Sequence, residues 1–180
     1  MSETSTAPMV ATGPARTAAW RKPEVWITVL LVVIDQLTKL LVLQRLALHE
    51  VVPVIPGLLN VTYVRNTGAA FGMLNASDFA YKPLIVAGLA VLALVGILWY
   101  AQKFAGDAWA ARYGFVLIVA GAVGNLIDRV TLGYVIDFVD VYVGTWHFWA
   151  FNVADAAITV GALLFIVDTL FTRHDVPQAV

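Results

Sequence analysis

Residues 124–155 contain three polar blocks, which read Gly124-Asn125-Leu126-Ile127-Asp128-Arg129, Val135-Ile136-Asp137-Phe138 and Phe151-Asn152-Val153-Ala154-Asp155. Together the blocks hold three carboxylates and two amides, and the sequence on both sides is apolar enough to lie in lipid. An ionisable side chain in a bilayer is costly, and by default it marks a functional site. We therefore expect the chemistry of this protein to lie in this stretch.

The composition predicts the class of protein. Of the residues, 61% are hydrophobic and only 13% are charged, with a mean hydropathy of +0.82. Several apolar runs approach the ~20 residues that cross a bilayer, so the chain is predicted to be a polytopic membrane protein. A net charge of -1 without a basic run argues against nucleic acid as a partner. The absence of cysteine excludes disulfides, thiolate metal sites and cysteine nucleophiles.

Hydropathy predicts four spans, at about residues 25–43, 84–100, 108–127 and 153–171. Residues 1–22 are predicted to form a disordered cytoplasmic tail, residues 23–172 a single membrane domain, and residues 173–180 a second cytoplasmic tail. The first span is not expected to be a removable signal peptide, because it begins late, contains Asp35 and Lys39, and lacks a small-residue cleavage site.

Basic residues predict the orientation of the spans. By the positive-inside rule both termini are expected to be cytoplasmic. The residues that support this are Arg16, Arg21, Lys22, Lys103, Arg112 and Arg173. The bias is modest, because the opposite side carries Arg45, Arg65, Lys82 and Arg129. Tryptophan and tyrosine near the span ends fit interfacial belts, at Trp20, Trp26, Trp99, Tyr100, Trp109, Trp146 and Trp149.

The first outer loop is predicted to form a small antiparallel sheet on the outer membrane surface. Strand-forming residues occupy positions 51–55 and 58–65, with a Pro56-Gly57 turn between them. The segment 66–72 ends the second strand in small residues that let backbone approach a ligand or helix closely. The expected fold is therefore an all-α membrane protein with a small β element: four transmembrane helices plus an extracytoplasmic cradle of sheet and loop.

This topology brings the polar residues to one depth. The outer ends of the first, third and fourth spans carry Asp35 with Lys39, Asn125 with Asp128, and Asn152 with Asp155. Asn66 is expected just above them, and Asp137 lies in the short segment that joins the last two spans. Independent spans would not usually place polar residues in one layer, so a shared site in the outer leaflet is favoured.

Each polar residue also has a purely structural interpretation. Asp35 and Lys39 are spaced to neutralise one another across one helical turn. Asn152 and Asp155 resemble a capping box. Asp128 opposes the dipole at a helix C-terminus, and pairing with Arg129 in a supporting role is the preferred interpretation. Outside the site, Asp140 is expected to face solvent, Asp168 to snorkel or pair locally, and His147 to be interfacial.

A pair of aspartates near a membrane surface suggests two chemistries. Two carboxylates that share one proton keep an acid and a base available together, which is the arrangement of aspartic proteases. The alternative is a small ion- or proton-coupled transporter that uses the intramembrane aspartates. Transport usually needs polar residues that continue to the opposite face, yet the second span is free of charge and the inner halves of the others offer little but Asp168. The site is therefore predicted to open on one side only.

Five blocks together resemble the bacterial lipoprotein signal peptidases, the signal peptidase II family. The blocks are Asp35-Gln36-Leu37-Thr38-Lys39, Asn66-Thr67-Gly68-Ala69-Ala70-Phe71-Gly72, Gly124-Asn125-Leu126-Ile127-Asp128-Arg129, Val135-Ile136-Asp137-Phe138 and Phe151-Asn152-Val153-Ala154-Asp155. Any one block is weak, but all five in order, from about Val25 to Phe171, are highly specific.

The resemblance implies an aspartyl endopeptidase of the bacterial inner membrane. It would remove signal peptides from diacylglyceryl-modified prolipoproteins before the lipidated cysteine, without a metal or organic cofactor, and would be a target of globomycin-type antibiotics. The resemblance places the catalytic pair at Asp137 and Asp155. The residues expected to bind substrate or support the site are Asp35, Lys39, Asn66, Gly68, Asn125, Asp128, Arg129 and Asn152.

Overall fold

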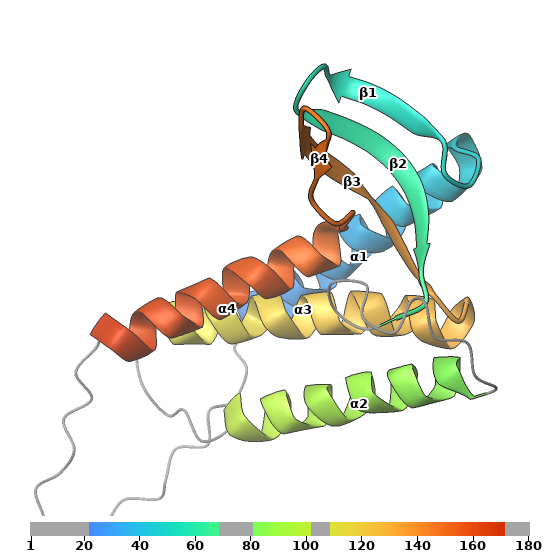
Figure 1. Ribbon diagram of the computed structural model, residues 1–180. Coiled ribbons are helices and arrows are strands. Elements are labelled where there is room, and N and C mark those ends of the chain that lie inside the picture. The colour runs from blue at the N-terminus through green and yellow to red at the C-terminus, as the bar shows by residue number, and fades with distance from the viewer. Residues whose placement is uncertain (1–21, 69–80, 102–108, 172–180) are drawn as a thin grey trace, which may run out of the picture.

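The computed structural model describes residues 22–68, 81–101 and 109–171 (Figure 1). Its four long helices are α1 (Lys22–Arg45), α2 (Lys82–Ala101), α3 (Trp109–Thr131) and α4 (Val153–Phe171). Each is long and apolar enough to cross a membrane. The four predicted spans are confirmed, and the chain is a multi-pass membrane protein.

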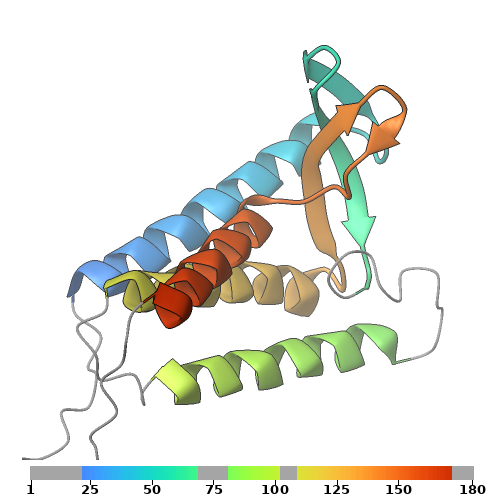
Figure 2. The same ribbon diagram turned by 60° about the vertical axis from the view of Figure 1, so that its left-hand side comes forward.

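Helix α3 lies between α2 and the other two helices (Figures 1 and 2). Its contact with α4 depends on glycine, because a Cβ atom on Gly114 would lie 2.7 Å from the carbonyl oxygen of Gly161. A Cβ atom on Gly161 would in turn lie 2.5 Å from the carbonyl oxygen of Gly114. Small residues let membrane helices approach until their backbones touch, and van der Waals packing then holds them. The sequence of α3 and α4 therefore brings the two helices unusually close.

The sheet has four antiparallel strands in the order β1-β2-β3-β4. Its strands are β1 (Val51–Ile55), β2 (Leu59–Asn66), β3 (Val135–Val143) and β4 (Trp146–His147). The sequence predicted the first two. The other two come from the segment between α3 and α4, which was expected only as a short joining segment. Figures 1 and 2 show the sheet at the end of the bundle where α1 and α3 finish and α4 begins.

The register of β2 against β3 changes once. Val61 lies opposite Val139, whereas Val64 lies opposite Asp137, so β2 holds one extra residue between these pairs. Such a bulge exchanges the faces on which the following side chains lie. Asn60, opposite Asp140, and Asn66, on the face of Asp137, consequently belong to opposite faces of the sheet.

An apolar cluster fastens the sheet to α1. Val42, near the end of α1, packs with Tyr63 from β2 and with Ile136 and Phe138 from β3. Burying one large apolar side chain contributes about 1.5–3 kcal/mol. This cluster fixes β3, and with it Asp137, against the end of the helical bundle where α1 finishes.

The opposite end of the bundle carries a second group of buried charges. Glu24 at the start of α1 forms an ion pair with Arg112 at the start of α3. Asp168 in the last turns of α4 is 6% exposed. Of the two roles expected for Asp168, snorkelling to the surface is excluded by this burial, and local pairing stays a prediction.

Tryptophan side chains near the helix ends are exposed, as the interfacial prediction requires. Trp26, Trp99 and Trp109 are all exposed. Trp20 lies outside the described residues, as does the expected turn at residues 69–72.

Candidate active site

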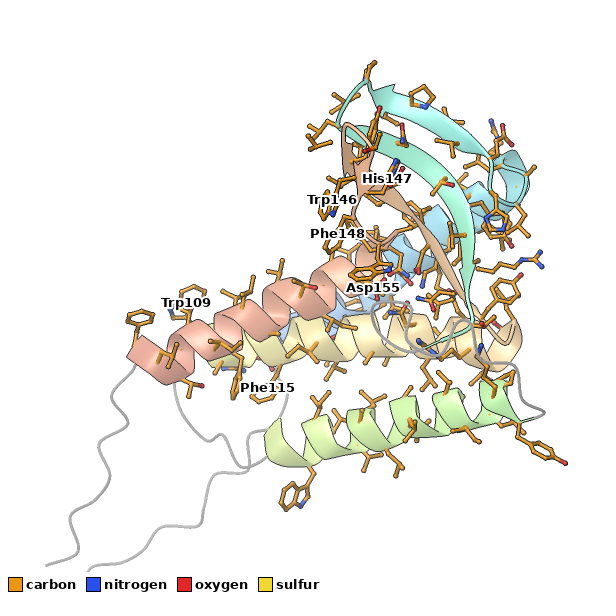
Figure 3. All side chains as sticks on the ribbon, viewed as in Figure 1. Trp109, Phe115, Trp146, His147, Phe148 and Asp155 are labelled. Carbon is orange, nitrogen blue, oxygen red and sulfur yellow. The ribbon has the colours of Figure 1, made fainter. Side chains whose placement is uncertain are left out.

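Asp155 owes its position to the start of α4. The side-chain oxygen of Asn152 accepts a hydrogen bond from the Asp155 backbone N–H at 2.9 Å, and Asp155 Oδ2 accepts one from the Asn152 backbone N–H at 3.3 Å. This reciprocal pair is a capping box, which satisfies two otherwise unpaired donors of the first helical turn. The structural interpretation of these residues is therefore confirmed. The same cap places the carboxylate beside the sheet, where Figure 3 labels it.

Asn152 also joins the two carboxylates that the sequence singled out. Its Nδ2 atom donates to Asp137 Oδ1 at 2.7 Å, while its backbone and Oδ1 contact Asp155. Asn66 Nδ2 donates to Asp137 Oδ2 at 3.0 Å, and Asn66 Oδ1 accepts a hydrogen bond from Gly68 N. Strand β2, strand β3 and helix α4 therefore meet at one pair of aspartates.

Burial and neighbouring charge both change the pKa of the Asp137 carboxyl group. Asp137 is 2% exposed. Burial, with the nearby negative charge of Asp155 as a second cause, raises the pKa of Asp137 to about 7. Hydrogen bonds from Asn66 and Asn152 and the positive charge of Lys39 act in the opposite direction. Two interacting carboxyl groups titrate as a pair, and one proton is shared between them over the range between their two titrations. The site can therefore hold an acid and a base together near neutral pH.

A buried ion cluster lies next to this pair. Lys39, 1% exposed, contacts Asp35 Oδ2 at 2.8 Å and Asp128 Oδ2 at 3.0 Å. Asp35 Oδ1 accepts a hydrogen bond from Ala154 N, and Asp128 Oδ2 accepts one from Ile136 N. The expected pairing of Asp35 with Lys39 is present, and it extends into a cluster that holds α1, α3, β3 and the start of α4 together.

The interpretation of Asp128 and Arg129 as partners needs correction. Asp128 pairs with Lys39, whereas Arg129 donates to the carbonyl oxygens of Asn125 at 3.2 Å and Gly68 at 3.3 Å. Successive residues on a helix point in different directions and do not face each other. Arg129 therefore ties α3 to the end of β2.

Two residues of this region were not singled out in the sequence. Gln36 donates to Asp128 Oδ1 at 2.9 Å and to the Gly124 carbonyl oxygen at 3.2 Å. Lys82, a buried residue, donates to Thr67 Oγ1 at 2.9 Å. Gln36 lies between Asp35 and Lys39 in the sequence, and this position could have identified it as a residue of the site. Lys82 at the start of a span has the pattern of an ordinary interfacial lysine.

Asp140 does not face solvent, contrary to expectation. It is 8% exposed, accepts a hydrogen bond from Asn60 Nδ2 at 2.8 Å, and contacts His147 Nδ1 at 2.8 Å. Register explains the burial: Asp140 stands opposite Asn60 on β2, on the sheet face that does not carry Asp137. Figure 3 labels His147 on the sheet, above Asp155 at the start of α4.

The buried Asp137 and the half-buried Asp155, both in contact with Asn152, lie at the end of the four-helix bundle where α4 begins. The sequence model of the signal peptidase (SPase) II family matches residues 27–171, and the chain belongs to this family. Lipoprotein signal peptidases similar to it include that of Geobacter metallireducens, 47% identical over 144 residues, which are 80% of this chain and 88% of the relative. The lipoprotein signal peptidase of Syntrophus aciditrophicus is 43% identical over 141 residues, 78% of this chain and 88% of the relative.

A solved structure has the same fold. A bacterial membrane enzyme determined by the in meso method at 2.3 Å resolution superposes with a TM-score of 0.75 at 32% identity. The match covers 88% of this chain and 94% of the other. The chain is thus an aspartic peptidase by family, and the comparisons give no support to the transporter alternative.

Proposed function

We propose that the protein is an endopeptidase that removes signal peptides from diacylglyceryl-modified prolipoproteins, cutting before the lipidated cysteine. The observation that carries the proposal is that one residue, Asn152, donates to both carboxylates, from its side-chain amide to Asp137 Oδ1 and from its backbone N–H to Asp155 Oδ2. A pair of carboxylates tied in this way, in a chain of this family, has the components for aspartic peptidase chemistry. Residues 23–172 form the peptidase domain in this proposal.

Asp137 and Asp155 supply the proton transfers. The ionised carboxylate takes a proton from a water molecule as its oxygen attacks the scissile carbonyl carbon, and the protonated carboxyl gives its proton to the carbonyl oxygen. As the tetrahedral intermediate collapses, the C–N bond breaks, the leaving nitrogen receives a proton from the pair, and one hydroxyl of the intermediate returns its proton to the pair as the carboxyl product forms. The carboxylates then again share one proton.

The remaining polar residues hold this pair in place. Asn66, Asn125 and Asn152 donate to the two carboxylates. Arg129 and Gly68 connect α3 to β2, and the cluster of Asp35, Lys39 and Asp128 supports the helices beneath the pair. No metal or organic cofactor has a part in these steps.

The position of the pair suits a lipid-anchored substrate. Asp155 lies in the first turn of a span, and Asp137 lies in the sheet that packs on the end of α1. The diacylglyceryl chains would remain in the bilayer while the extended cleavage segment lies along the sheet. Globomycin-type peptides would compete for this position, as the family resemblance implies.

Single-turnover cleavage of a diacylglyceryl-modified prolipoprotein tests the proposal. The purified protein is expected to cleave this substrate before the modified cysteine, to leave the unmodified precursor intact, and to keep its rate in the presence of a chelator. Equal cleavage of both precursors would contradict recognition of the lipid. Asp155-dependent proton or sodium flux into vesicles, without cleavage, would contradict the peptidase.

We further propose that the protein lies in the inner membrane with both termini in the cytoplasm and Asp137 and Asp155 on the periplasmic side. The support is the bias of basic residues toward the tails and the loop between α2 and α3. Reporter fusions at residue 105 are expected to show cytoplasmic activity only, and fusions within the loop that carries β1 and β2 periplasmic activity. The reverse pattern would invert the orientation.

A further inference from the structure

Lys39 is the one cation in the ion cluster, and its ammonium group is fully used. Lysine has three N–H donors and no acceptor. The three contacts of Lys39 Nζ are Asp35 Oδ2 at 2.8 Å, Asp128 Oδ2 at 3.0 Å and Asn125 Oδ1 at 3.0 Å. Two of these partners are charged and neutralise the lysine. The third is a neutral amide, which charge balance does not require.

The contact with Lys39 fixes which way the Asn125 amide faces. An ammonium group cannot accept a hydrogen bond, so the Asn125 atom toward Lys39 has to be the oxygen. The amide nitrogen then faces the other way, and it donates to Asp155 Oδ1 at 2.7 Å. With the amide reversed, its oxygen would lie against a carboxylate oxygen. Lys39 therefore selects the one orientation in which Asn125 stabilises Asp155.

The same oxygen also orients the side-chain amide of Asn152, which donates to Asp137. Asn125 Oδ1 also accepts a hydrogen bond from Asn152 Nδ2 at 3.2 Å. Asn152 Nδ2 in turn donates to Asp137 Oδ1 at 2.7 Å. Hydrogen bonds in such a chain polarise one another, most strongly at low local dielectric. Lys39, Asn125 and Asn152 are all buried, with exposures of 1%, 6% and 0%.

We propose, building on the peptidase function proposed above, that Lys39 is a positioning residue for the aspartate pair and acts through Asn125. Lys39 does not reach the reacting atoms: it orients and polarises the amide that donates to Asp155. The competing role is only structural, in which Lys39 neutralises Asp35 and Asp128 and does nothing for the chemistry. The two roles differ in what happens to folded protein when Lys39 is replaced.

The variant that separates the roles is Lys39→Met combined with Asp35→Asn, which removes one positive and one negative charge together. Its matched control is Arg112→Met with Glu24→Gln, which removes the ion pair joining the same two helices at their other ends. Both are expected to lower the melting temperature. Only the Lys39 variant is expected to lose single-turnover rate in the folded fraction, by about 10- to 100-fold, the range for groups that orient reacting groups, with substrate KM little changed.

A double-mutant cycle with Asn125→Ala tests whether Lys39 acts through Asn125. Once Asn125 is removed, replacing Lys39 and Asp35 is expected to cost little further rate, although its effect on melting temperature remains. If the folded Lys39/Asp35 variant had the same single-turnover rate as the Arg112/Glu24 control, the proposal would be overturned. The proposal would also be overturned if the rate losses of the Lys39/Asp35 variant and of Asn125→Ala multiplied in full when combined, because Lys39 would then act independently of Asn125.

A second measurement does not depend on turnover. The Asn125 side-chain amide is expected to give a downfield-shifted, exchange-protected NMR signal, as a donor to a carboxylate does, in the wild type and in the Arg112/Glu24 control. In the Lys39 variant the signal is expected to move and to lose protection. An unchanged signal would overturn the role of Lys39 even if the protein cleaved no prolipoprotein, and a changed signal without cleavage in the wild type would contradict the proposed function alone.

Discussion

Folded protein with Asp137→Asn or Asp155→Asn is expected to lose cleavage of a lipidated prolipoprotein by roughly 10⁴-fold, because one carboxyl group cannot serve as both acid and base. The double variant is expected to lose no more than either single one, since the pair works as a unit. Folding and substrate binding should persist, because an amide and a carboxylate are nearly isosteric. Single-turnover rates and melting temperatures of purified variants measure these effects.

Asp128→Asn is the informative comparison for the pair. It removes a carboxylate that contacts Lys39 at 3.0 Å, so the melting temperature and yield should fall. The protein that still folds should keep measurable turnover. If Asp137→Asn instead kept near-normal turnover while folded Asp128→Asn was inactive, the pair would have to be reassigned to Asp128 and Asp155.

Gly161→Val is expected to have the largest effect on folding. The added Cβ would lie 2.5 Å from the Gly114 carbonyl oxygen and 3.0 Å from the Ile118 backbone nitrogen, so α3 and α4 would have to separate. Overpacking of this kind costs about 1–3 kcal/mol, and more where backbone blocks relief. Since α3 carries Asn125 and α4 carries Asp155, activity should fall with the folded fraction.

Gly88→Val provides the matched control for this helix contact. A Cβ atom on Gly88, in α2, would meet nothing within 4 Å. Melting temperature in detergent should therefore change little for Gly88→Val and fall strongly for Gly161→Val. Equal changes in the two variants would mean that helix propensity, and not the contact of α3 with α4, determines the outcome.

The spans were predictable because a bilayer requires long apolar runs, and these are visible along the chain. The layer of polar residues followed from the alternating direction of the spans. The end of α3 was placed too early: the helix continues to Thr131, past Asp128 and Arg129. Polar residues at a span end suggest a helix terminus, but here Asp128 contacts Lys39 and Arg129 donates to two backbone carbonyls within the protein.

The contact partners of the polar residues were less predictable from the sequence than their positions in the fold. Asp128 contacts Lys39, which is distant in sequence, and not its neighbour Arg129. Strict alternation along β2 would put Asn60 and Asn66 on one face, yet the register change between Val61 and Val64 puts them on opposite faces. The burial of Asp140 opposite Asn60 was missed for a different reason, because the segment that forms β3 was expected only to join two spans.

The ion pair of Asp35 and Lys39 bears on how the protein is made. As α1 enters the bilayer ahead of the later helices, it carries these two charges one helical turn apart and 2.8 Å from each other in the finished fold. A paired acid and base within one helix lower the cost of inserting either alone. Asp128 and Asn125 arrive only with α3, and Asp155 only with α4. Helix α1 therefore inserts with its two central charges already paired, and the full polar cluster comes together only after the last span has been synthesised.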